Sequence, residues 1–437
     1  MKDRFRPVPQ GRLGRLVALG QLAGGVATGM MGEGLRRFSN GERPHLSDLL
    51  LTPSNALKVT GQLSRMRGAA MKLGQMLSLD AGDLLPPELT TILAQLRDTA
   101  HFMPPGQLQQ SLDTAWGPGW RRHFLRFDTT PIAAASIGQV HRATLTDGRD
   151  LAVKVQYPGI AASIDADIDN VATLLRISGL LPPALDITPH LAAAKQQLHE
   201  EADYLREAEQ MRRYGALLLG DSRFVVPAPV EDLLRPTVLP MNFLQGAPIE
   251  TLSSASDTER NAAMEAMLDL VLRELFEFGL MQTDPNFANY RWQRDSGRIA
   301  LLDFGATRPV TAQNAEDYRT VLRAGLAGDI AAIRKALVTM GFISSAQISR
   351  HGAALDAMLR LAVRHLQEEC DGIFDFGKRD IVMTLRDQAA PMLADRATWH
   401  LPAAENLFTQ RKISGMALLC ANMQARVPLM DMLSRYR

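Results

Sequence analysis

The pattern of apolar and polar positions divides the chain into a helical first part, a strand-rich middle and a helical last part. In residues 54–79 apolar side chains recur every three or four positions, which predicts an amphipathic helix. Short apolar runs separated by turn residues follow between 124 and 155 and predict antiparallel strands. From residue 256 onward helical patterns dominate, apart from a short hairpin in 289–303. A small sheet followed by a large helical region predicts an α+β fold with two lobes.

These patterns and the turn-rich breaks between them divide the chain into four predicted segments. The segments are a basic, glycine-rich arm (1–40), a helical extension (41–115), a small lobe with a sheet and a helical insertion (116–245), and a helical lobe (246–437). Two lobes of such different composition predict a cleft between them as the place of the functional site.

Composition limits the classes of function. With 46% hydrophobic and 22% charged residues, the 437-residue chain can bury a large core. Lysine and arginine (48) exceed aspartate and glutamate (47) by only one, so the positive excess typical of a nucleic-acid binder is missing. Two cysteines are too few for a disulfide framework and favour a reduced, cytosol-like compartment. No Cys/His metal-binding motif is present in the sequence, so a bound metal is expected to have oxygen ligands.

The N-terminal arm contains the one segment that suggests a membrane contact. Residues 16–32 carry no charge, but the run is short for a spanning helix and includes five glycines. Two GxxxG pairs, at 20–24 and 25–29, would allow close contact between helices in an apolar medium. Flanking arginines would attract anionic lipid head groups. A flexible arm, a membrane anchor and a homodimer contact therefore all stay open as interpretations.

Three motifs in a fixed order carry the candidate chemistry. Lys154 lies near the end of an apolar strand, where a buried ammonium can bind nucleotide phosphates. Asp284 and Asn289 have the D-x-x-x-x-N spacing of a kinase catalytic loop. Fourteen residues after Asn289, Asp303 opens an Asp-Phe-Gly motif behind another apolar strand. Each motif alone is weak, but their order and spacing together predict phosphoryl chemistry.

The residue types fit that chemistry. Asn289 and Asp303 offer the hard oxygen ligands that Mg²⁺ prefers, and Asp284 is placed to orient or deprotonate an attacking hydroxyl group. The cofactors expected are therefore ATP, or ADP, and Mg²⁺. Lys154 needs a carboxylate to hold its ammonium in place. The predicted helix 191–211 offers five candidates: Glu200, Glu201, Asp203, Glu207 and Glu209.

With these motifs the chain resembles the UbiB family of atypical kinase-like proteins, and within it the branch of mitochondrial coenzyme Q biosynthesis kinases. The resemblance runs from about Leu13 to the C-terminus and rests on five motifs. They are Lys72-Leu73-Gly74-Gln75 (KxGQ), Ala133-Ala134-Ala135-Ser136 (an alanine-rich nucleotide loop), Glu201-Ala202-Asp203 (ExD), Gln282-Thr283-Asp284-Pro285-Asn286 (the catalytic loop) and Asp303-Phe304-Gly305-Ala306-Thr307-Arg308 (the metal loop). The resemblance implies a protein-kinase-like, two-lobed fold with the helical extension packed over the active site.

The same resemblance implies roles for individual residues. Glu201 becomes the partner of Lys154, and Asp203 belongs to the ExD feature near the active site. Lys72 and Gln75, with Gly74 between them, would occupy the cleft where a kinase receives its protein substrate.

The resemblance also implies the nucleotide contacts. Those residues are Ala133, Ala134, Ala135, Ser136, Gly138, Lys154 and Met241. Among the loop residues, only Gly138 lacks a side chain that limits a close backbone approach to the phosphates. Asn242, after the gatekeeper-like Met241, stands where the family often has an acidic residue, which leaves the adenine contact open.

The function implied is a Mg²⁺-dependent ATPase that supports ubiquinone (coenzyme Q) biosynthesis at a membrane surface. It would be cytoplasmic and peripheral on a bacterial inner membrane, or on the matrix side in a mitochondrion. Expected partners are membrane lipids or quinone precursors and ubiquinone-biosynthesis enzymes. The alternative is a non-catalytic, nucleotide-switched scaffold or a lipid-presenting chaperone. Phosphotransfer to a separate protein is disfavoured by Lys72 and Gln75 in the substrate cleft, and the C-terminal pair of membrane helices of the UbiB type is missing.

Overall fold

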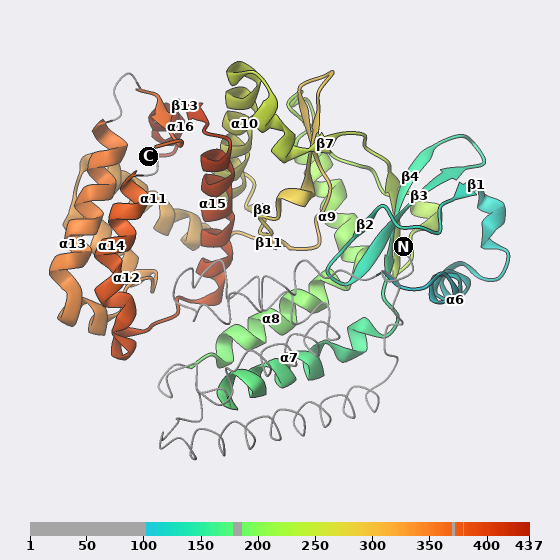
Figure 1. Cartoon of the computed structure of the whole chain (residues 1–437), viewed down its shortest axis with the longest axis horizontal. Helices are drawn as coiled ribbons and strands as arrows, with labels where there is room; N and C mark the ends of the chain where they lie inside the picture. Colours follow the sequence, from blue (N-terminus) through green and yellow to red (C-terminus); the bar gives the residue numbers. More distant parts are fainter. Residues whose placement is uncertain (1–101, 178–185, 369–371, 379) are drawn as a thin grey trace, which may run out of the picture. The chain divides into compact units, whose positions relative to one another are not determined.

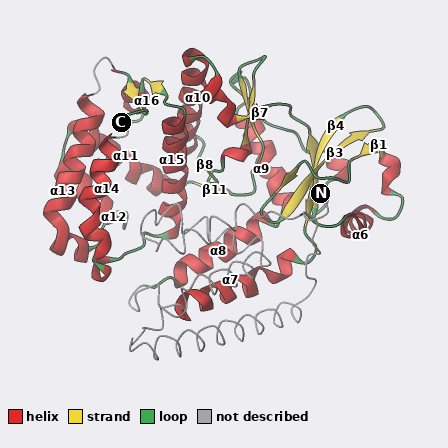
Figure 2. Cartoon of the chain, in the orientation of Figure 1, coloured by secondary structure: helices red, strands yellow, loops and turns green. Residues whose placement is uncertain are grey.

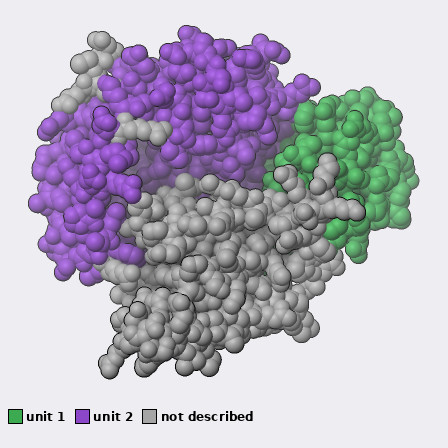
Figure 3. Space-filling model, in the orientation of Figure 1, with its two compact units in different colours: residues 1–209, 228–243 green, residues 210–227, 244–437 purple. Residues whose placement is uncertain are grey.

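The computed structural model describes residues 102–177, 186–368, 372–378 and 380–437 (Figure 1). The predicted arm 1–40 and the predicted extension up to residue 101, with Lys72, Gly74 and Gln75, lie outside the described residues. The chain forms two compact units (Figure 3). Unit 1 holds the described residues up to Glu209 together with Ala228–Phe243, and unit 2 holds Gln210–Pro227 and Leu244–Arg437.

An antiparallel five-stranded sheet forms the centre of unit 1 (yellow in Figure 2). Its strands follow the order β1-β3-β4-β6, and β2 pairs with β3. Their bounds are β1 (Phe124–Phe127), β2 (Ala133–Ala134), β3 (Gly138–Leu145), β4 (Asp150–Gln156) and β6 (Val238–Asn242). Strand β3 alternates buried and half-buried positions from Gln139 onward, and its buried positions include the polar residues Gln139 and His141. The turn before β4 contains Gly148, whose φ of 86° favours glycine.

Helices and aromatic rings complete unit 1. Helix α6 (Pro105–Trp116) packs near β4, and the indole of Trp116 donates a 2.7 Å hydrogen bond to the carbonyl of Leu233. Helices α7 (Ile160–Ile177) and α8 (Thr188–Glu201) lie side by side and form the helical insertion (Figure 1). Helix α9 (Tyr204–Leu217) follows, and the division between the two units falls within it.

Unit 2 carries three small sheets beside its long helices, and two of them lie near the predicted catalytic residues. One sheet has the order β5-β10-β9-β7, and a separate ribbon pairs β11 with β8. The bounds are β5 (Phe224–Val225), β7 (Ala247–Pro248), β8 (Leu280–Gln282), β9 (Tyr290–Gln293), β10 (Arg298–Leu301) and β11 (Thr307–Pro309). Strands β9 and β10 are the hairpin predicted between 289 and 303, and β10 leads directly to the Asp-Phe-Gly motif.

The helices of unit 2 fall into two groups. Helix α10 (Asp257–Phe276) begins with a capping box between Ser256 and Glu259 and packs on α15 (Ala404–Asn422). A second group is a bundle that packs in chain order (Figure 1). It contains α11 (Ala312–Ala327), α12 (Ile330–Thr339), α13 (Ser345–Glu368) and α14 (Asp380–Ala394).

Strands β12 (Phe374–Asp375) and β13 (Arg426–Val427) pair, and α16 (Leu429–Ser434) follows them.

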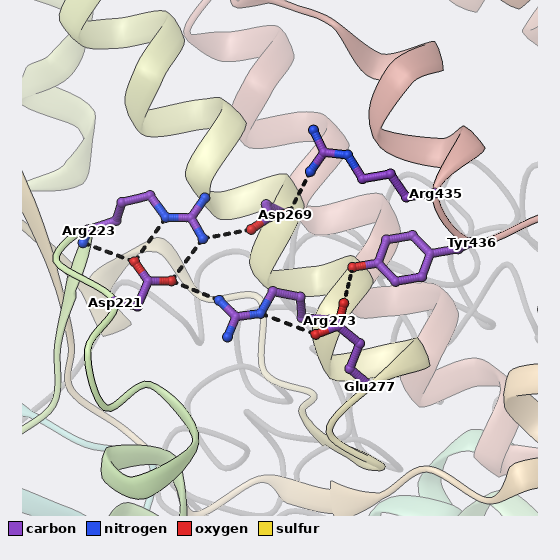
Figure 4. Close-up of polar contacts among 7 residues, drawn as sticks. All are labelled: Asp221, Arg223, Asp269, Arg273, Glu277, Arg435 and Tyr436. Atoms are coloured by element: carbon purple, nitrogen blue, oxygen red, sulfur yellow. Dashed lines mark hydrogen bonds and ion pairs between the residues drawn. The ribbon is translucent and has the colours of Figure 1, made fainter.

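A network of charged groups ties the C-terminal end of the chain to α10 (Figure 4). Its members are Asp221, Arg223, Asp269, Arg273, Glu277, Arg435 and Tyr436. Arg223 joins Asp221 and Asp269 at 2.8 and 2.7 Å, and Arg435 lies 3.7 Å from Asp269. Hydrogen bonds from Arg223 and Arg273 hold the pKa of the Asp221 carboxyl well below its usual value. The end of α16 is thereby fixed to the helix that precedes the catalytic loop.

The described structure confirms the α+β class, with an antiparallel sheet in unit 1 and mainly helices in unit 2. Within the described parts of the chain, no helix combines the length and the apolar character that crossing a bilayer requires.

Candidate functional site

Lys154 lies inside β4, between Val140 of β3 and Leu239 of β6. Its Nζ atom is 2.8 and 2.9 Å from the two carboxylate oxygens of Glu207 on α9. The two side chains are only 8% and 0% exposed, so the ion pair is shielded from solvent. The ammonium also lies 5.3 Å from the ring centroid of Tyr204. A buried lysine held in this way has a fixed position on the sheet.

The structure pairs Lys154 with Glu207, whereas Glu201 was the expected partner. Glu201 is the last residue of α8, and its carboxylate accepts hydrogen bonds from Ser136 at 3.1 Å and Gln197 at 3.2 Å. The physical reason is a helix break, because Asp203 Oδ1 accepts the backbone N–H groups of Leu205 and Arg206 and starts a new helix. Glu207 lies on the buried side of that helix.

The sequence pattern of α9 indicates that Glu207 faces the protein interior, although the family motif favours Glu201 as the partner of Lys154. Tyr204, Ala208 and Met211 are all 0% exposed, and their spacing of four and three residues marks the buried face of α9. Glu207 lies on that face, three residues after Tyr204 and four before Met211. Asp203 itself is an exposed residue that caps α9, so in the structure its side chain organises the helix that carries Glu207.

The alanine-rich loop is a tight turn at the edge of the sheet. Ala133 and Ala134 form β2 opposite Val140 and Gln139, and the backbone N–H of Ala135 donates to the carbonyl of Gly138 at 2.9 Å. The hydroxyl of Ser136 donates to Glu201, which ties this turn to the end of α8.

At position 138 there is no room for a side chain, so a glycine is required. A Cβ atom at this position would lie 2.5 Å from the carbonyl oxygen of Val155 and 2.7 Å from the hydroxyl of Tyr204. The glycine therefore lets β3 approach β4 and α9 closely, next to the lysine of β4. Met241 of β6 is buried opposite Ala152 of β4, within the same sheet.

Unit 2 places the second group of predicted residues around the end of β8. Asp284 follows β8 after Thr283, whose hydroxyl donates to the carbonyl of Ala306 at 2.8 Å. The amide nitrogen of Asn289 lies 3.4 Å from Asp284 Oδ2 and 3.5 Å from the Asp284 carbonyl oxygen. The structure thus brings these two predicted residues into direct contact.

Asp303 reaches the same region through the β9–β10 hairpin. The backbone N–H of Leu302 donates to the carbonyl of Asn289 at 3.0 Å, which places Asp303 next to the catalytic loop. Asp303 Oδ1 accepts the backbone N–H of Gly305 at 3.0 Å, which orients its carboxylate.

These side chains fit Mg²⁺ that is shared with phosphate oxygens. Asp303 and Asn289 supply a carboxylate and an amide oxygen, which are hard donors of the kind Mg²⁺ prefers. Among the described residues, no three His, Cys, Asp or Glu side chains gather into a cage that could hold a metal without further ligands. A metal at Asn289 and Asp303 would therefore complete its coordination with a nucleotide and water, as Mg²⁺ commonly does.

A small antiparallel sheet with a lysine–glutamate ion pair, and an Asp–Asn–Asp set beside a hairpin, define a protein of the kinase-like class. Residues 95–337 match the family model described as the ABC1 atypical kinase-like domain. Among curated relatives, the mitochondrial atypical kinase COQ8 of Saccharomyces cerevisiae is 36% identical over 421 residues, which cover 96% of this chain and 83% of the relative. The mitochondrial atypical kinase COQ8B of Rattus norvegicus is 36% identical over 435 residues, covering 99% and 81%.

The chain is also similar to a solved structure. The erythromycin complex of Rv3197 from Mycobacterium tuberculosis aligns with a TM-score of 0.57 and 25% identity, covering 86% of this chain and 94% of that one. The chain therefore belongs to the UbiB family of ABC1 atypical kinase-like proteins, in the COQ8 branch, as the sequence motifs predict.

Proposed function

We propose that the protein is a Mg²⁺-dependent ATPase that supports coenzyme Q biosynthesis at a membrane surface. The observation that carries this proposal is the buried ion pair of Lys154 with Glu207, 2.8 Å apart. In kinases a lysine fixed by a helix glutamate binds nucleotide phosphates. A buried ion pair contributes little net stability, because desolvation offsets the attraction between its charges, and this favours a functional role for the pair on this sheet. The relatives named COQ8 support the role in coenzyme Q biosynthesis.

In the proposed mechanism five side chains have separate roles. Lys154 binds the phosphates and is held in place by Glu207. Asn289 and Asp303 would hold Mg²⁺, which supplies neutralisation of the charge that develops on the transferred phosphoryl group. Asp284 accepts a hydrogen bond from the attacking water or hydroxyl, and the Asn289 amide beside it restricts the orientation of its carboxylate.

Nucleotide binding and turnover test the proposal together. Mg·ATP is expected to raise the melting temperature of the wild-type protein, and hydrolysis is expected to fall to background in Lys154→Ala. Asp147→Asn, in an exposed turn of unit 1, is the matched control and should keep full turnover. If nucleotide raises the melting temperature but hydrolysis with lipid never exceeds that of Lys154→Ala, the protein is a nucleotide-switched scaffold and the ATPase proposal fails.

A further inference from the structure

We define the catalytic loop as residues 283–289, from the end of β8 to Asn289. Helix α15 contacts this loop at Pro285 and also contacts the two residues that flank it. We propose that α15 fixes the conformation of this loop, with Lys412 and Gly415 as positioning residues. The kinetic part of this inference rests on the proposed ATPase function, whereas its structural part does not. The contacts join segments that are 122 and 130 residues apart in the chain.

The contact at the centre of the loop is between Gly415 and Pro285. A Cβ atom at Gly415 would lie 2.2 Å from Cβ and 2.9 Å from Cγ of Pro285. These distances are far below van der Waals contact, so only glycine permits the present separation of helix and loop. Pro285 directly follows Asp284, and displacement of the proline therefore moves the backbone of Asp284.

The contacts beside the ends of the loop come from Lys412, one turn before Gly415. Its ammonium donates to the hydroxyl of Tyr290 at 3.0 Å and to Gln282 Oε1 at 3.3 Å. Gln282 lies immediately before the loop and Tyr290 immediately after it. Because one ammonium binds both residues, it holds the two ends of the loop at a fixed separation.

The Lys412 ammonium is itself held by Glu274 of α10. Glu274 Oε2 lies 3.5 Å from Nζ, and both side chains are 1% exposed. Glu274 Oε1 accepts the hydroxyl of Tyr214 at 2.7 Å and the backbone N–H of Gln282 at 3.2 Å. The carboxylate therefore also contacts the strand that leads into the loop.

The buried pair keeps its lysine charged. Burial raises the pKa of Glu274, an effect that Lys412 opposes. For Lys412, burial alone lowers the pKa, but the nearby Glu274 and Tyr290 outweigh it and leave the pKa above its usual value. A buried ion pair is a weak source of net stability, because desolvation offsets the attraction between the charges. Its directed bonds to Gln282 and Tyr290 point to positioning as its role.

The first test compares two glycines on helices. In Gly415→Ala the new methyl group displaces Pro285, whereas Gly325→Ala on α11 adds a methyl group that meets no atom within 4 Å. Gly415→Ala is expected to increase amide hydrogen exchange in residues 283–290 without nucleotide. It should also lower kcat on the order of 10²-fold, as a small misplacement of a catalytic group does, with KM changed less than about twofold. Gly325→Ala should do neither, and equal behaviour of the two variants would overturn the proposal.

The second test separates positioning from stability. Lys412→Met leaves Glu274 buried without its cation and should lower the melting temperature. The double variant Lys412→Met/Glu274→Gln removes both charges and should recover most of that loss. The bonds to Gln282 and Tyr290 are still missing, so exchange in 283–290 should stay fast and kcat low. Recovery of loop protection and kcat along with the melting temperature would show a merely structural pair and overturn the proposal.

The two readouts keep this inference separate from the ATPase proposal. If the wild-type protein hydrolyses no nucleotide, the proposed function fails, and exchange in 283–290 of the Gly415 and Lys412 variants still decides whether α15 holds the loop. If the wild type hydrolyses ATP and the variants show unchanged exchange, the inference about α15 fails alone.

Discussion

Lys154 and Glu207 form a closed ion pair, in which one ammonium lies within 2.9 Å of both oxygens of one carboxylate. The glutamate comes from α9, after the helix break at Asp203, and the ExD glutamate, Glu201, instead binds Ser136 of the alanine-rich turn. The two carboxylates therefore have different tasks: Glu207 fixes the lysine, and Glu201 fixes the turn.

Substitution of these two glutamates should separate their tasks. Glu207→Gln removes the charge that compensates a buried ammonium and should lower the free energy of unfolding by about 3 kcal/mol, measured by urea denaturation. It should also weaken nucleotide binding in a thermal-shift titration. Glu209→Gln, exposed on the same helix, is the control. A greater loss of nucleotide affinity in Glu201→Gln than in Glu207→Gln would contradict the assignment.

Close packing at Gly138 predicts a large cost for one methyl group. Gly138→Ala would bring Cβ to 2.5 Å from the Val155 carbonyl oxygen, and relief of that clash requires β3 to move from β4. We expect a loss of about 2 kcal/mol of unfolding free energy, as for other overpacked sites. Gly106→Ala in α6 meets no atom within 4 Å and should be neutral or slightly stabilising. Equal urea midpoints for the two variants would show that the sheet accommodates the methyl group.

Stability should fall in mild acid because of His141. Burial lowers the pKa of this histidine from 6.5 to about 4, although its hydrogen bond to the Asp128 carbonyl opposes the shift. Between these values the unfolded chain binds more protons than the folded one, so stability is lost as the pH falls from about 6.5 towards 4.

The measurement for this prediction is the melting temperature between pH 8 and pH 4. His141→Gln, which can retain polar contacts without a titrating ring, should show a shallower decline than the wild type over that interval. Parallel curves for the two proteins would place the acid sensitivity elsewhere.

The N-terminal arm is proposed to supply the membrane contact. Residues 1–40 hold seven basic and two acidic side chains, an excess that favours anionic lipid surfaces. Deletion of residues 1–40 should abolish co-sedimentation with anionic vesicles, while neutral vesicles should bind both proteins weakly. Full retention of the truncated protein on anionic vesicles would show that the arm does not supply the membrane contact.

Much of the fold and part of the site could be predicted from local sequence. Three features could be predicted because each depends on a pattern of only a few neighbouring residues. They are the strand that bears Lys154, the D-x-x-x-x-N loop and the hairpin before Asp303. The partner of Lys154 was harder, because a single helix was predicted over 191–211. The structure breaks it between α8 and α9 at Ala202 and Asp203, which changes the side that each carboxylate faces.

The support from α15 could not be predicted in this way. Gly415 and Lys412 look like ordinary positions of an amphipathic helix, and their significance depends on packing against Pro285, Gln282 and Tyr290, far earlier in the chain. Contacts across such a separation leave no periodic signal in a single sequence.

The most direct test of the central claim is ATP hydrolysis measured with anionic liposomes and a phenolic mimic of a quinone precursor. We expect Mg²⁺-dependent turnover by the wild-type protein that lipid and mimic increase, and background turnover by Asp303→Asn under the same conditions. Equal turnover by Asp303→Asn and wild type would contradict the proposed ATPase function.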